Sequence, residues 1–379
     1  MSTTTTVRGT ASALEDAPVD WFRDSRPRLR ADAELLAGLD DKPLLHIGAS
    51  GRYIAIGREV VPLLPLFDGS AAGSELVERI RGERDADQVA DRLARLAHGL
   101  RQAGALDEPP ARVGGRRGIA RFMRREHLLR LPLTRSVDRA LEPLIAPLRS
   151  VPGSQLVALW VALAALGAVL GVLALATAGA DWRPPAHLWL VYPLLFAQIA
   201  AHELSHALVC QYLRVPVREA GIGLMLYVMP VGYVDRTDAY RVPDRRSRAF
   251  LSLAGPVNDQ LWFGVAAVVA LTVPGEVGDL AFVLLVFQAF LTVMNLNPVT
   301  PSDGYHAVSA LAGEVNVRGQ ALSFLTHRLL RLPLPQGVAA LSARRRRFFV
   351  GYALACLAFL VLLVAGVART VIGLVEVLS

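Results

Sequence analysis

Two histidines and a glutamate stand close together in one apolar stretch of the sequence. The segment His202-Glu203-Leu204-Ser205-His206 lies near the end of an apolar run at about residues 188–209. Residues four apart share one face of a helix, so both imidazoles can turn toward a single ion, with Glu203 projecting beside them. Zinc held by nitrogen and oxygen ligands lowers the pKa of bound water to about 7, and a neighbouring carboxylate can pass its proton to a leaving amine. This spacing therefore predicts hydrolysis of a peptide bond.

A third ligand is expected from a polar string that follows another apolar run, at residues 295–305. Two prolines and a glycine interrupt the helix around Asp303, and irregular backbone of this kind is tolerated in a membrane only inside protein or beside water. Asp303 is therefore predicted to be the oxygen ligand of a Zn²⁺ site. His306 is expected to lie outside the ligand set, because three protein ligands already complete a catalytic zinc site.

The apolar setting favours a functional site over a chance motif. On a soluble helix the same pattern also describes two capped histidines beside a surface glutamate. Within a membrane span, two histidines and a glutamate are costly to bury without a function. We therefore expect a metal site.

The composition is that of an integral membrane protein with a water-facing domain. The 379 residues are 53% hydrophobic, and the mean hydropathy of +0.39 is too high for an ordinary soluble enzyme. The net charge of +7 comes mainly from arginines clustered beside apolar stretches, which favours a role in membrane topology over nucleic-acid binding. Cys210 and Cys356 give neither a disulfide framework nor a cysteine metal site.

Five apolar stretches have roughly the 20 residues that cross a bilayer, the fourth being slightly short. They are predicted at about residues 156–177, 188–209, 250–273, 280–296 and 348–374. Arginines are concentrated before the first stretch, between the second and third, and between the fourth and fifth. By the positive-inside rule, these loops and the N-terminal domain are expected in the cytoplasm. The fold class is therefore mainly α, as a multi-pass protein of the cell membrane with about five transmembrane helices.

A small soluble domain is predicted before the apolar stretches. Alternation over residues 44–48 and 53–57 predicts two short strands, and helical spacing follows over residues 60–67, 74–80 and 85–104. This order is typical of an α+β winged-helix-like domain. The predicted boundaries are an N-terminal arm at 1–42, this domain at 43–108, a basic linker with an amphipathic approach at 109–153, and the transmembrane domain at 154–379.

The two metal motifs together resemble the site-2 protease family of intramembrane zinc metalloproteases. H-E-x-x-H is followed about a hundred residues later by N-P-x-x-P-x-D-G. The stretches P-V-G-Y-V-D-R-T-D-A-Y-R at 230–241 and A-G-P-V-N-D at 254–259 resemble the subgroup of peptide zinc metalloproteases. The resemblance covers about residues 197–306. It implies zinc binding by His202, His206 and Asp303, with Glu203 as the catalytic base.

Short segments of the N-terminal domain resemble peptide-recognition domains of PqqD type. They are G-R-Y-I-A-I-G at 51–57, L-F-D-G at 66–69, L-V-E-R-I at 76–80 and L-R-Q-A-G-A-L-D at 100–107. The resemblance implies that the domain holds the leader of a ribosomally made peptide against an exposed strand and helix, by β-augmentation. A small regulatory or structural domain is the alternative.

Four residues are expected to bind substrate. Asn258 lies in a Gly-Pro-flanked start of the third span, where the family resemblance implies a residue that holds substrate or the oxyanion; a helix-packing asparagine is the alternative. Asn297 lies in the polar string after the fourth span. Gly221 and Gly223 belong to segment 221–234, which resembles a membrane-embedded hairpin that pairs with an unwound substrate.

The charged residues after this hairpin have a simpler interpretation. Asp235 and Asp238 are expected to form salt bridges with Arg236 or Arg241 at the membrane edge. The sequence contains no Gly-rich phosphate loop of Walker type, which disfavours an ATP-driven transporter.

These motifs together predict an intramembrane zinc metalloprotease. Its expected partners are the lipid bilayer and a membrane-associated or ribosomally synthesised precursor peptide, whose leader it would remove in natural-product maturation. One alternative is regulated cleavage of a signalling protein such as an anti-sigma factor, which the lack of an outer loop long enough for a PDZ domain disfavours. Another is a non-catalytic export or immunity factor with a vestigial metal site. The presence of Glu203 together with all three ligands favours hydrolysis.

Overall fold

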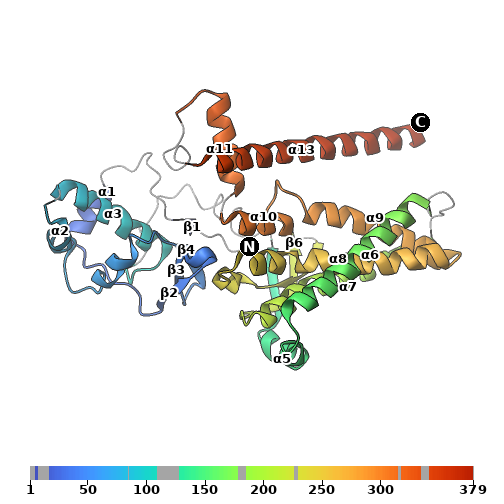
Figure 1. Ribbon diagram of the computed structural model, residues 1–379, viewed down its shortest axis with the longest axis horizontal. Helices are drawn as coiled ribbons and strands as arrows, with labels where there is room; N and C mark the ends of the chain where they lie inside the picture. Colours follow the sequence, from blue (N-terminus) through green and yellow to red (C-terminus); the bar gives the residue numbers. More distant parts are fainter. Residues whose placement is uncertain are drawn as a thin grey trace. The chain divides into compact units, whose positions relative to one another are not determined.

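The chain folds into two compact units, as the computed structural model in Figure 1 shows. The first unit comprises Met1–Leu129 and Tyr240–Asp244, and the second comprises Arg130–Ala239 and Arg245–Ser379. The structure describes residues 5–6, 17–83, 85–108, 128–177, 185–225, 229–314, 317–333 and 341–378.

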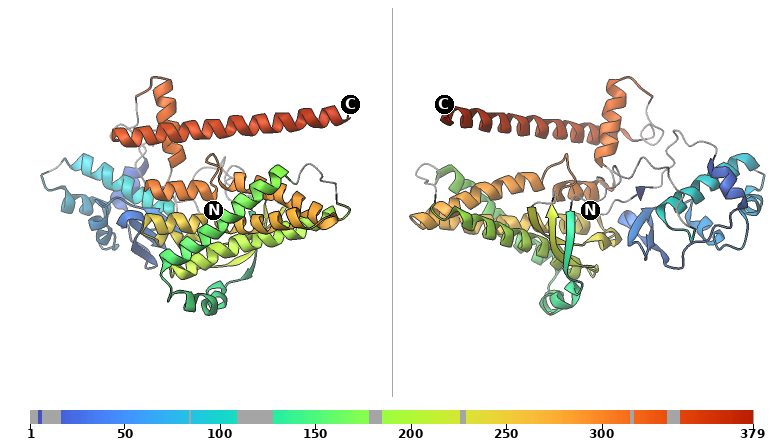
Figure 2. Two further views of the ribbon diagram at one scale, coloured as in Figure 1. Left: turned by 45° about the vertical axis from the view of Figure 1, so that its right-hand side comes forward. Right: turned by 180° about the vertical axis from the view of Figure 1, so that it is seen from behind.

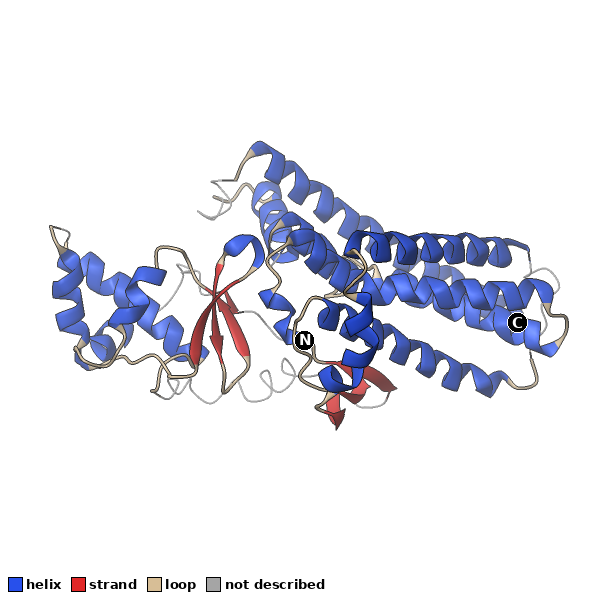
Figure 3. Cartoon of the chain, turned by 60° about the horizontal axis from the view of Figure 1, so that its bottom comes forward, coloured by secondary structure: helices blue, strands red, loops and turns tan. Residues whose placement is uncertain are grey.

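The first unit contains a four-stranded sheet in the order β1-β4-β3-β2. Figure 3 colours the strands of this sheet and of the second unit's sheet red. The strands β2, β3 and β4 form an antiparallel meander, and β1 pairs in parallel with β4. Two strands were expected from the sequence, and both are confirmed as β3 and β4. The bounds are β1 Thr5–Thr6, β2 Ala33–Ala37, β3 Pro43–Ile47 and β4 Arg52–Ala55.

Helices complete this unit and bury their apolar faces in one core with the sheet. The three helical segments expected here are confirmed, although the first is a 3-10 helix. Asp85 caps the last helix by accepting a hydrogen bond from the Asp87 backbone N–H at 3.0 Å, and Gly104 ends it at φ +80°. The bounds are α1 Ala17–Asp24, η1 Leu39–Asp41, η2 Val61–Leu66, α2 Gly73–Arg81 and α3 Ala86–Ala103.

The unit begins before the expected boundary at residue 43. Phe22 of α1 is 1% exposed within the core, and β2 pairs with β3 along its whole length. The region expected to be an arm at 1–42 therefore supplies a helix and an edge strand. The sequence of β2 is A-E-L-L-A, whose residues have high helix propensity and low strand propensity, so only its pairing with β3 makes it a strand.

The return segment Tyr240–Asp244 belongs to this unit although it follows β7 in the chain. Arg241 donates a hydrogen bond from Nε to the Tyr53 hydroxyl at 2.7 Å. The carbonyl of Pro243 accepts a bond from the Asp40 backbone N–H at 3.0 Å. Side chain and backbone contacts thus both hold this segment.

The second unit is a helical bundle with a small sheet. All five apolar stretches expected as spans are helical, as α6, α7, α8, α9 and α13. The bounds are α5 Val137–Leu148, α6 Gly153–Thr177, η4 Leu188–Leu190, α7 Val191–Tyr212, η5 Thr237–Arg241, α8 Arg245–Thr272, α9 Glu276–Asn295, α10 Asp303–Ala312, α11 Val317–Leu329 and α13 Ala343–Leu378.

Helix α8 packs against α6, α7, α9 and α10 and is the centre of the bundle (Figure 2). Its contact with α6 is made through glycines. A Cβ added to Gly167 would lie 2.0 Å from the carbonyl oxygen of Gln260, and Gly264 faces Gly167. Small residues of this kind let helix backbones approach closely where lipid gives no hydrophobic drive for association.

Three helices are long and apolar enough to cross a membrane, with mean hydropathies of 2.6 for α6, 2.1 for α9 and 2.7 for α13 over the described residues. Large apolar side chains on them face outward, including Val169 at 66% and Leu362 at 72% exposure. These features indicate a membrane protein. Helices α7 and α8 fall short of this composition because they carry buried polar residues such as His202 and Asp259. Hydropathy thus supports three of the five expected spans.

The hairpin expected at 221–234 is confirmed as β6 (Ala220–Met225) and β7 (Met229–Val234), which pair antiparallel. Strand β5 (Leu128–Thr134) joins them in the order β5-β6-β7. Asp235 donates its backbone N–H to the Glu219 carbonyl at 2.8 Å. Because bonding alternates along an antiparallel pair, the backbone groups of Val234 and Gly232 face away from β6.

A first prediction concerns Asp32, which ties the start of β2 to the turn after β3. Its carboxylate accepts hydrogen bonds from Arg30 Nε at 2.8 Å and from the Ala49 backbone N–H at 2.5 Å. The Arg30 side chain and then the Ala49 N–H hold the pKa of Asp32 below its usual range. A lowered carboxyl pKa stabilises the fold above the unfolded-chain pKa of about 4, and this stabilisation is lost as the pH falls through the folded-state value.

We expect Asp32→Asn to speed amide hydrogen exchange in residues 44–55 of the full chain at pH 7. The difference from wild type should shrink as the pH falls below about 4, because the wild-type carboxyl then becomes neutral as well. Amide hydrogen exchange of the two proteins, monitored by mass spectrometry at several pH values, measures the difference and its dependence on pH. Equal exchange of the two proteins at pH 7 would contradict the assigned role of Asp32.

Candidate metal centre

Helix α7 places both histidines of the motif in the interior of the second unit. Pro193 lies in the first turn of α7, where a missing N–H is tolerated, and Pro216 follows shortly after the end of this helix. His202 is 7% exposed and His206 is fully buried. The ring centroids are 4.9 Å apart and the Nε2 atoms 3.3 Å apart, so the expected convergence of the imidazoles is observed.

A break between α9 and α10 brings Asp303 to these histidines. Helix α9 ends at Asn295, and Asp303 is the first residue of α10. The hydroxyl of Ser302 accepts a hydrogen bond from the Tyr305 backbone N–H at 3.1 Å and donates one to the Asn297 carbonyl at 2.6 Å. This cap fixes the start of α10, where the helix dipole favours the negative charge of Asp303.

The three side chains form a buried cluster whose ligand atoms meet. Asp303 Oδ2 lies 3.0 Å from His202 Nε2 and 3.3 Å from His206 Nε2. One ligand atom from each residue lies within 4.8 Å of the others, and Asp303 is 6% exposed. This group could hold a metal ion.

The outward nitrogen of each imidazole faces an acceptor on α8. His202 Nδ1 lies 2.8 Å from Asp259 Oδ2, and His206 Nδ1 lies 2.8 Å from the Leu251 carbonyl oxygen. These acceptors assign the ring proton to Nδ1 in both histidines. Each Nε2 is then left with a lone pair that faces Asp303, which is the arrangement that metal-ligating histidines require.

Asp259 is itself held by a chain of side-chain amides that links three helices. Asn295 donates to Asp259 Oδ2 at 3.3 Å, and Gln198 Nε2 lies 3.5 Å from Asp259 Oδ1. Gln288 donates in turn to Gln198 Oε1 at 2.9 Å. A buried carboxylate needs such partners, so Asp259 accounts for the presence of Gln198, Gln288 and Asn295 in these helices.

Glu203 lies between its helix and the hairpin. Its Oε2 accepts a hydrogen bond from the Val234 backbone N–H at 3.2 Å. This N–H belongs to the outer edge of β7. The strand passes close to α7, since a Cβ added to Gly232 would lie only 3.4 Å from Ala200 Cα. The residue expected to act as base therefore stands next to both His202 and a strand edge.

Arg236 stands beside two of the three cluster residues. Its Nη2 donates a hydrogen bond to Asp303 Oδ1, and its Nη1 lies 2.7 Å from His206 Nδ1. The expected salt bridge of Asp235 or Asp238 to Arg236 is therefore wrong, whereas the alternative partner Arg241 stays a prediction. Arg218 binds Asp238 through Nε at 2.8 Å and Nη2 at 3.0 Å.

The two asparagines expected to bind substrate have different surroundings. Asn258 lies on α8 beside Asp259, and its Nδ2 is buried with no hydrogen-bond partner in the described part of the chain. The side chain of Asn297 accepts a bond from the Val299 backbone N–H at 2.7 Å and shapes the turn before Asp303. Asn258 thus retains a free donor, whereas Asn297 helps to position Asp303.

The two glycines expected to bind substrate lie within the three-stranded sheet. Gly223 pairs with Val231 of β7. A Cβ on Gly221 would lie 2.2 Å from the carbonyl oxygen of Leu131, so β5 occupies this side of β6. Their part in substrate binding stays a prediction, as it does for the asparagines.

Three residues that contact the cluster are not predicted by the sequence. Asp259 could have been found, because an acid in an apolar stretch is costly and marks a site. Arg236 was assigned to a surface ion pair, and nothing local in the sequence tells that its partner is 67 residues away. Gly255 packs on the His202 ring, and a glycine in a helix gives no such signal by itself.

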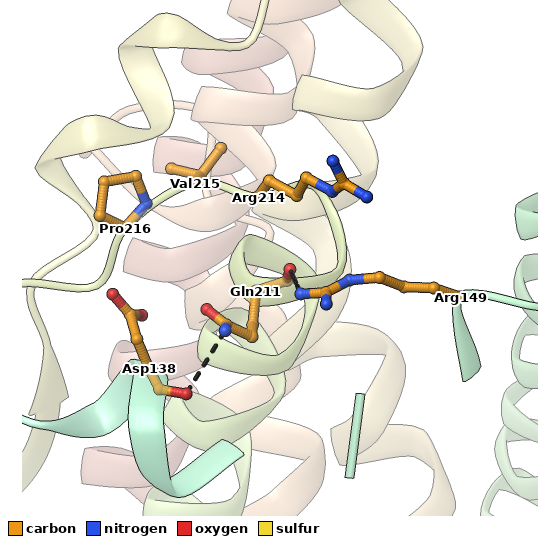
Figure 4. A pocket seen from close by; sticks show the side chains of 6 residues that line it. All are labelled: Asp138, Arg149, Gln211, Arg214, Val215 and Pro216. Carbon is orange, nitrogen blue, oxygen red and sulfur yellow. Dashed lines mark hydrogen bonds between the residues drawn. The ribbon is translucent and has the colours of Figure 1, made fainter. Parts of the chain in front are cut away.

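A cavity of about 360 Å³ lies at the C-terminal end of α7. It is lined by Asp138, Arg149, Gln211, Arg214, Val215 and Pro216 (Figure 4). Gln211 Nε2 donates to the Asp138 carbonyl at 3.3 Å, and Arg149 lowers the pKa of Glu142 by hydrogen bonding to it. These bonds join α5 to α7. The cavity contains none of the metal-cluster residues.

The chain was compared with family models, curated proteins and solved structures. None of the three comparisons gives a match. The function therefore has to be argued from the site itself.

A second prediction follows from the contact of Gly255 with His202. A Cβ at position 255 would lie 2.3 Å from His202 Nε2 and 2.4 Å from Cε1. Gly255→Ala must therefore displace the imidazole from Asp303. We expect metal affinity to fall roughly 10- to 100-fold, as is typical when the support of a metal ligand is disturbed. Titration of the purified protein with a metal-competing chelator measures it.

Gly351→Ala is the matched control, because nothing lies within 4 Å of a Cβ at this position of α13. It should leave metal affinity unchanged. Equal metal affinities for the two alanine variants would show that the His202 ring is not part of a metal site.

Proposed function

We propose that this chain is a multi-pass membrane zinc metalloprotease that hydrolyses a peptide bond. One observation carries the proposal: two Nε2 lone pairs and one carboxylate oxygen meet within 3.0–3.3 Å in a buried cluster. Such atoms repel one another unless a cation or a proton lies between them.

The distances support zinc. Ligands of a tetrahedral zinc site, with bonds of about 2.0–2.1 Å, lie roughly 3.3–3.4 Å apart. The observed separations of 3.0, 3.3 and 3.3 Å are close to this value. Two imidazoles and one carboxylate also suit zinc better than magnesium or calcium, which prefer oxygen ligands. His202, His206 and Asp303 would hold the ion.

The charges around the cluster support a divalent ion. Glu203, Asp259 and Asp303 contribute three carboxylates, and Arg236 contributes one guanidinium. With neutral imidazoles, two negative charges are left without compensation. One divalent cation would cancel them, which matters in a part of the protein where net buried charge is costly.

Zinc held by these residues would make water acidic near neutral pH. Glu203 follows His202 on α7, and its carboxylate would take up a proton and deliver it to the leaving amine. Asp259 and the Leu251 carbonyl keep both imidazoles in the ligating tautomer. The edge of β7 beside Glu203 offers backbone groups to an extended substrate, which would otherwise hide its peptide bonds in a helix.

The substrate class proposed is a precursor peptide whose leader docks on the N-terminal unit. Strand β2 is at the end of its sheet, and Leu35 on it is 46% exposed. An open edge with an exposed apolar side chain suits β-augmentation by a peptide. Regulated cleavage of a signalling protein uses the same chemistry, and no observation on this chain favours it. The complete cluster with Glu203 also argues against a non-catalytic export or immunity factor.

A third prediction tests hydrolysis on detergent-purified protein with a candidate precursor peptide. Glu203→Gln should keep zinc but lower cleavage by about 10²- to 10⁴-fold, the usual contribution of a general base. Asp303→Ala should lose zinc and activity together, because it removes one of three ligands. Metal analysis and mass spectrometry of the products give the two readouts.

His306→Ala is the matched control for these variants. His306 follows Asp303 closely and packs on Tyr305 at 5.3 Å between ring centroids, but it is outside the cluster. It should keep zinc and activity near wild type. The protease proposal fails when wild type binds no zinc or when Glu203→Gln cleaves as fast as wild type.

A fourth prediction tests the membrane topology proposed, with the N-terminal unit in the cytoplasm. The native Cys210 and Cys356 are buried, so an added surface cysteine can be labelled selectively. In intact cells a membrane-impermeant maleimide should label Pro274→Cys, between α8 and α9, but not Asp20→Cys. Both positions are exposed, and both should react after the membrane is opened. The reverse pattern would place the N-terminal unit outside.

A further inference from the structure

Arg236 occupies an unusual place for a positive charge, directly beside the atoms that would hold a metal cation. It follows β7, and its side chain is 27% exposed, whereas that of Asp303 is 7% exposed. A cation close to a metal site weakens metal binding by repulsion. The arginine therefore needs a compensating role.

The two oxygens of Asp303 have different partners. Oδ2 faces the Nε2 atoms of His202 and His206 at 3.0 and 3.3 Å. Oδ1 faces the other way and accepts the hydrogen bond from Arg236 Nη2. A carboxylate can bind a metal through one oxygen or through both, and here one oxygen is already taken.

The other terminal nitrogen of Arg236 lies 2.7 Å from His206 Nδ1. Because that ring nitrogen carries a proton, the hydrogen bond of the guanidinium to the cluster is the one to Asp303. Arginine presents several N–H groups in a fixed plane, whereas lysine has one flexible ammonium. A lysine at this position would keep the charge but would not hold Asp303 Oδ1 in the same fixed plane.

We propose that Arg236 is a positioning residue of the metal centre, which makes Asp303 a one-oxygen ligand. By holding Oδ1, it turns Oδ2 toward the imidazoles. This inference rests on the metal site of the proposed function. It goes beyond that function in giving Arg236 a task that its charge alone would not perform.

The experiment separates positioning from charge by measuring metal affinity in Arg236→Lys. We expect the zinc dissociation constant to rise about 10- to 100-fold, the cost typical of removing the partner of a metal ligand. Zinc affinity is measured on the full-length protein by competition with a chelator. Folding of the variant is checked by its helical circular dichroism and by gel filtration.

Arg218→Lys is a closely matched control. Arg218 is 30% exposed and grips a buried carboxylate, Asp238, that is 5% exposed. The same substitution there costs a similar ion pair, and neither Arg218 nor Asp238 belongs to the metal cluster. Its zinc affinity should stay within about 3-fold of wild type, because only outer partners of a ligand carry the larger cost. Equal zinc affinities for Arg236→Lys and wild type would overturn the proposal.

A second measurement uses only the wild-type protein and so does not depend on how the variant folds. The infrared difference spectrum between zinc-loaded and zinc-free protein, with isotopically labelled aspartate, reports how the carboxylate binds. A wide separation of its two stretching bands is expected for one-oxygen binding, and a narrow separation would overturn the proposal. Wild type that binds no zinc at all would instead refute the proposed function.

Discussion

The close approach of two imidazole nitrogens and one carboxylate oxygen is the constraint on which the rest of the second unit depends. These atoms lie within 3.0–3.3 Å in a site with almost no access to water. Lone pairs at this distance destabilise a low-dielectric interior unless a positive charge is placed among them. The surrounding helices can be understood as the structure needed to hold this arrangement together.

Helix α8 does most of this holding. It supplies Asp259 and the Leu251 carbonyl to the two histidines, and it lets His202 fit by having no side chain at Gly255. Its other side meets α6 through a glycine contact that brings the backbones together. The site is thus built on rigid packed helices, while only Asp303 comes from an interrupted segment, which the Ser302 cap fixes.

The three residues that could hold a metal ion could be predicted from the sequence because their signal is local. The spacing of His202 and His206 sets their shared helix face, and the break around Asp303 marks a polar niche in an apolar region. The partners of these ligands could not be predicted with the same ease, because Arg236 and Asp259 are joined to them only by the fold. The alternation of apolar residues predicted β3 and β4. Strand β2 has helix-forming residues and is a strand only because it pairs with β3.

The most direct test of the account is X-ray absorption at the metal edge of the purified wild-type protein, after its metal content has been determined. The account predicts one zinc per chain, with two imidazole nitrogens, light oxygen neighbours and no sulfur. Protein without bound metal, or a metal shell that lacks imidazole, would contradict the central claim that His202, His206 and Asp303 form a metal centre.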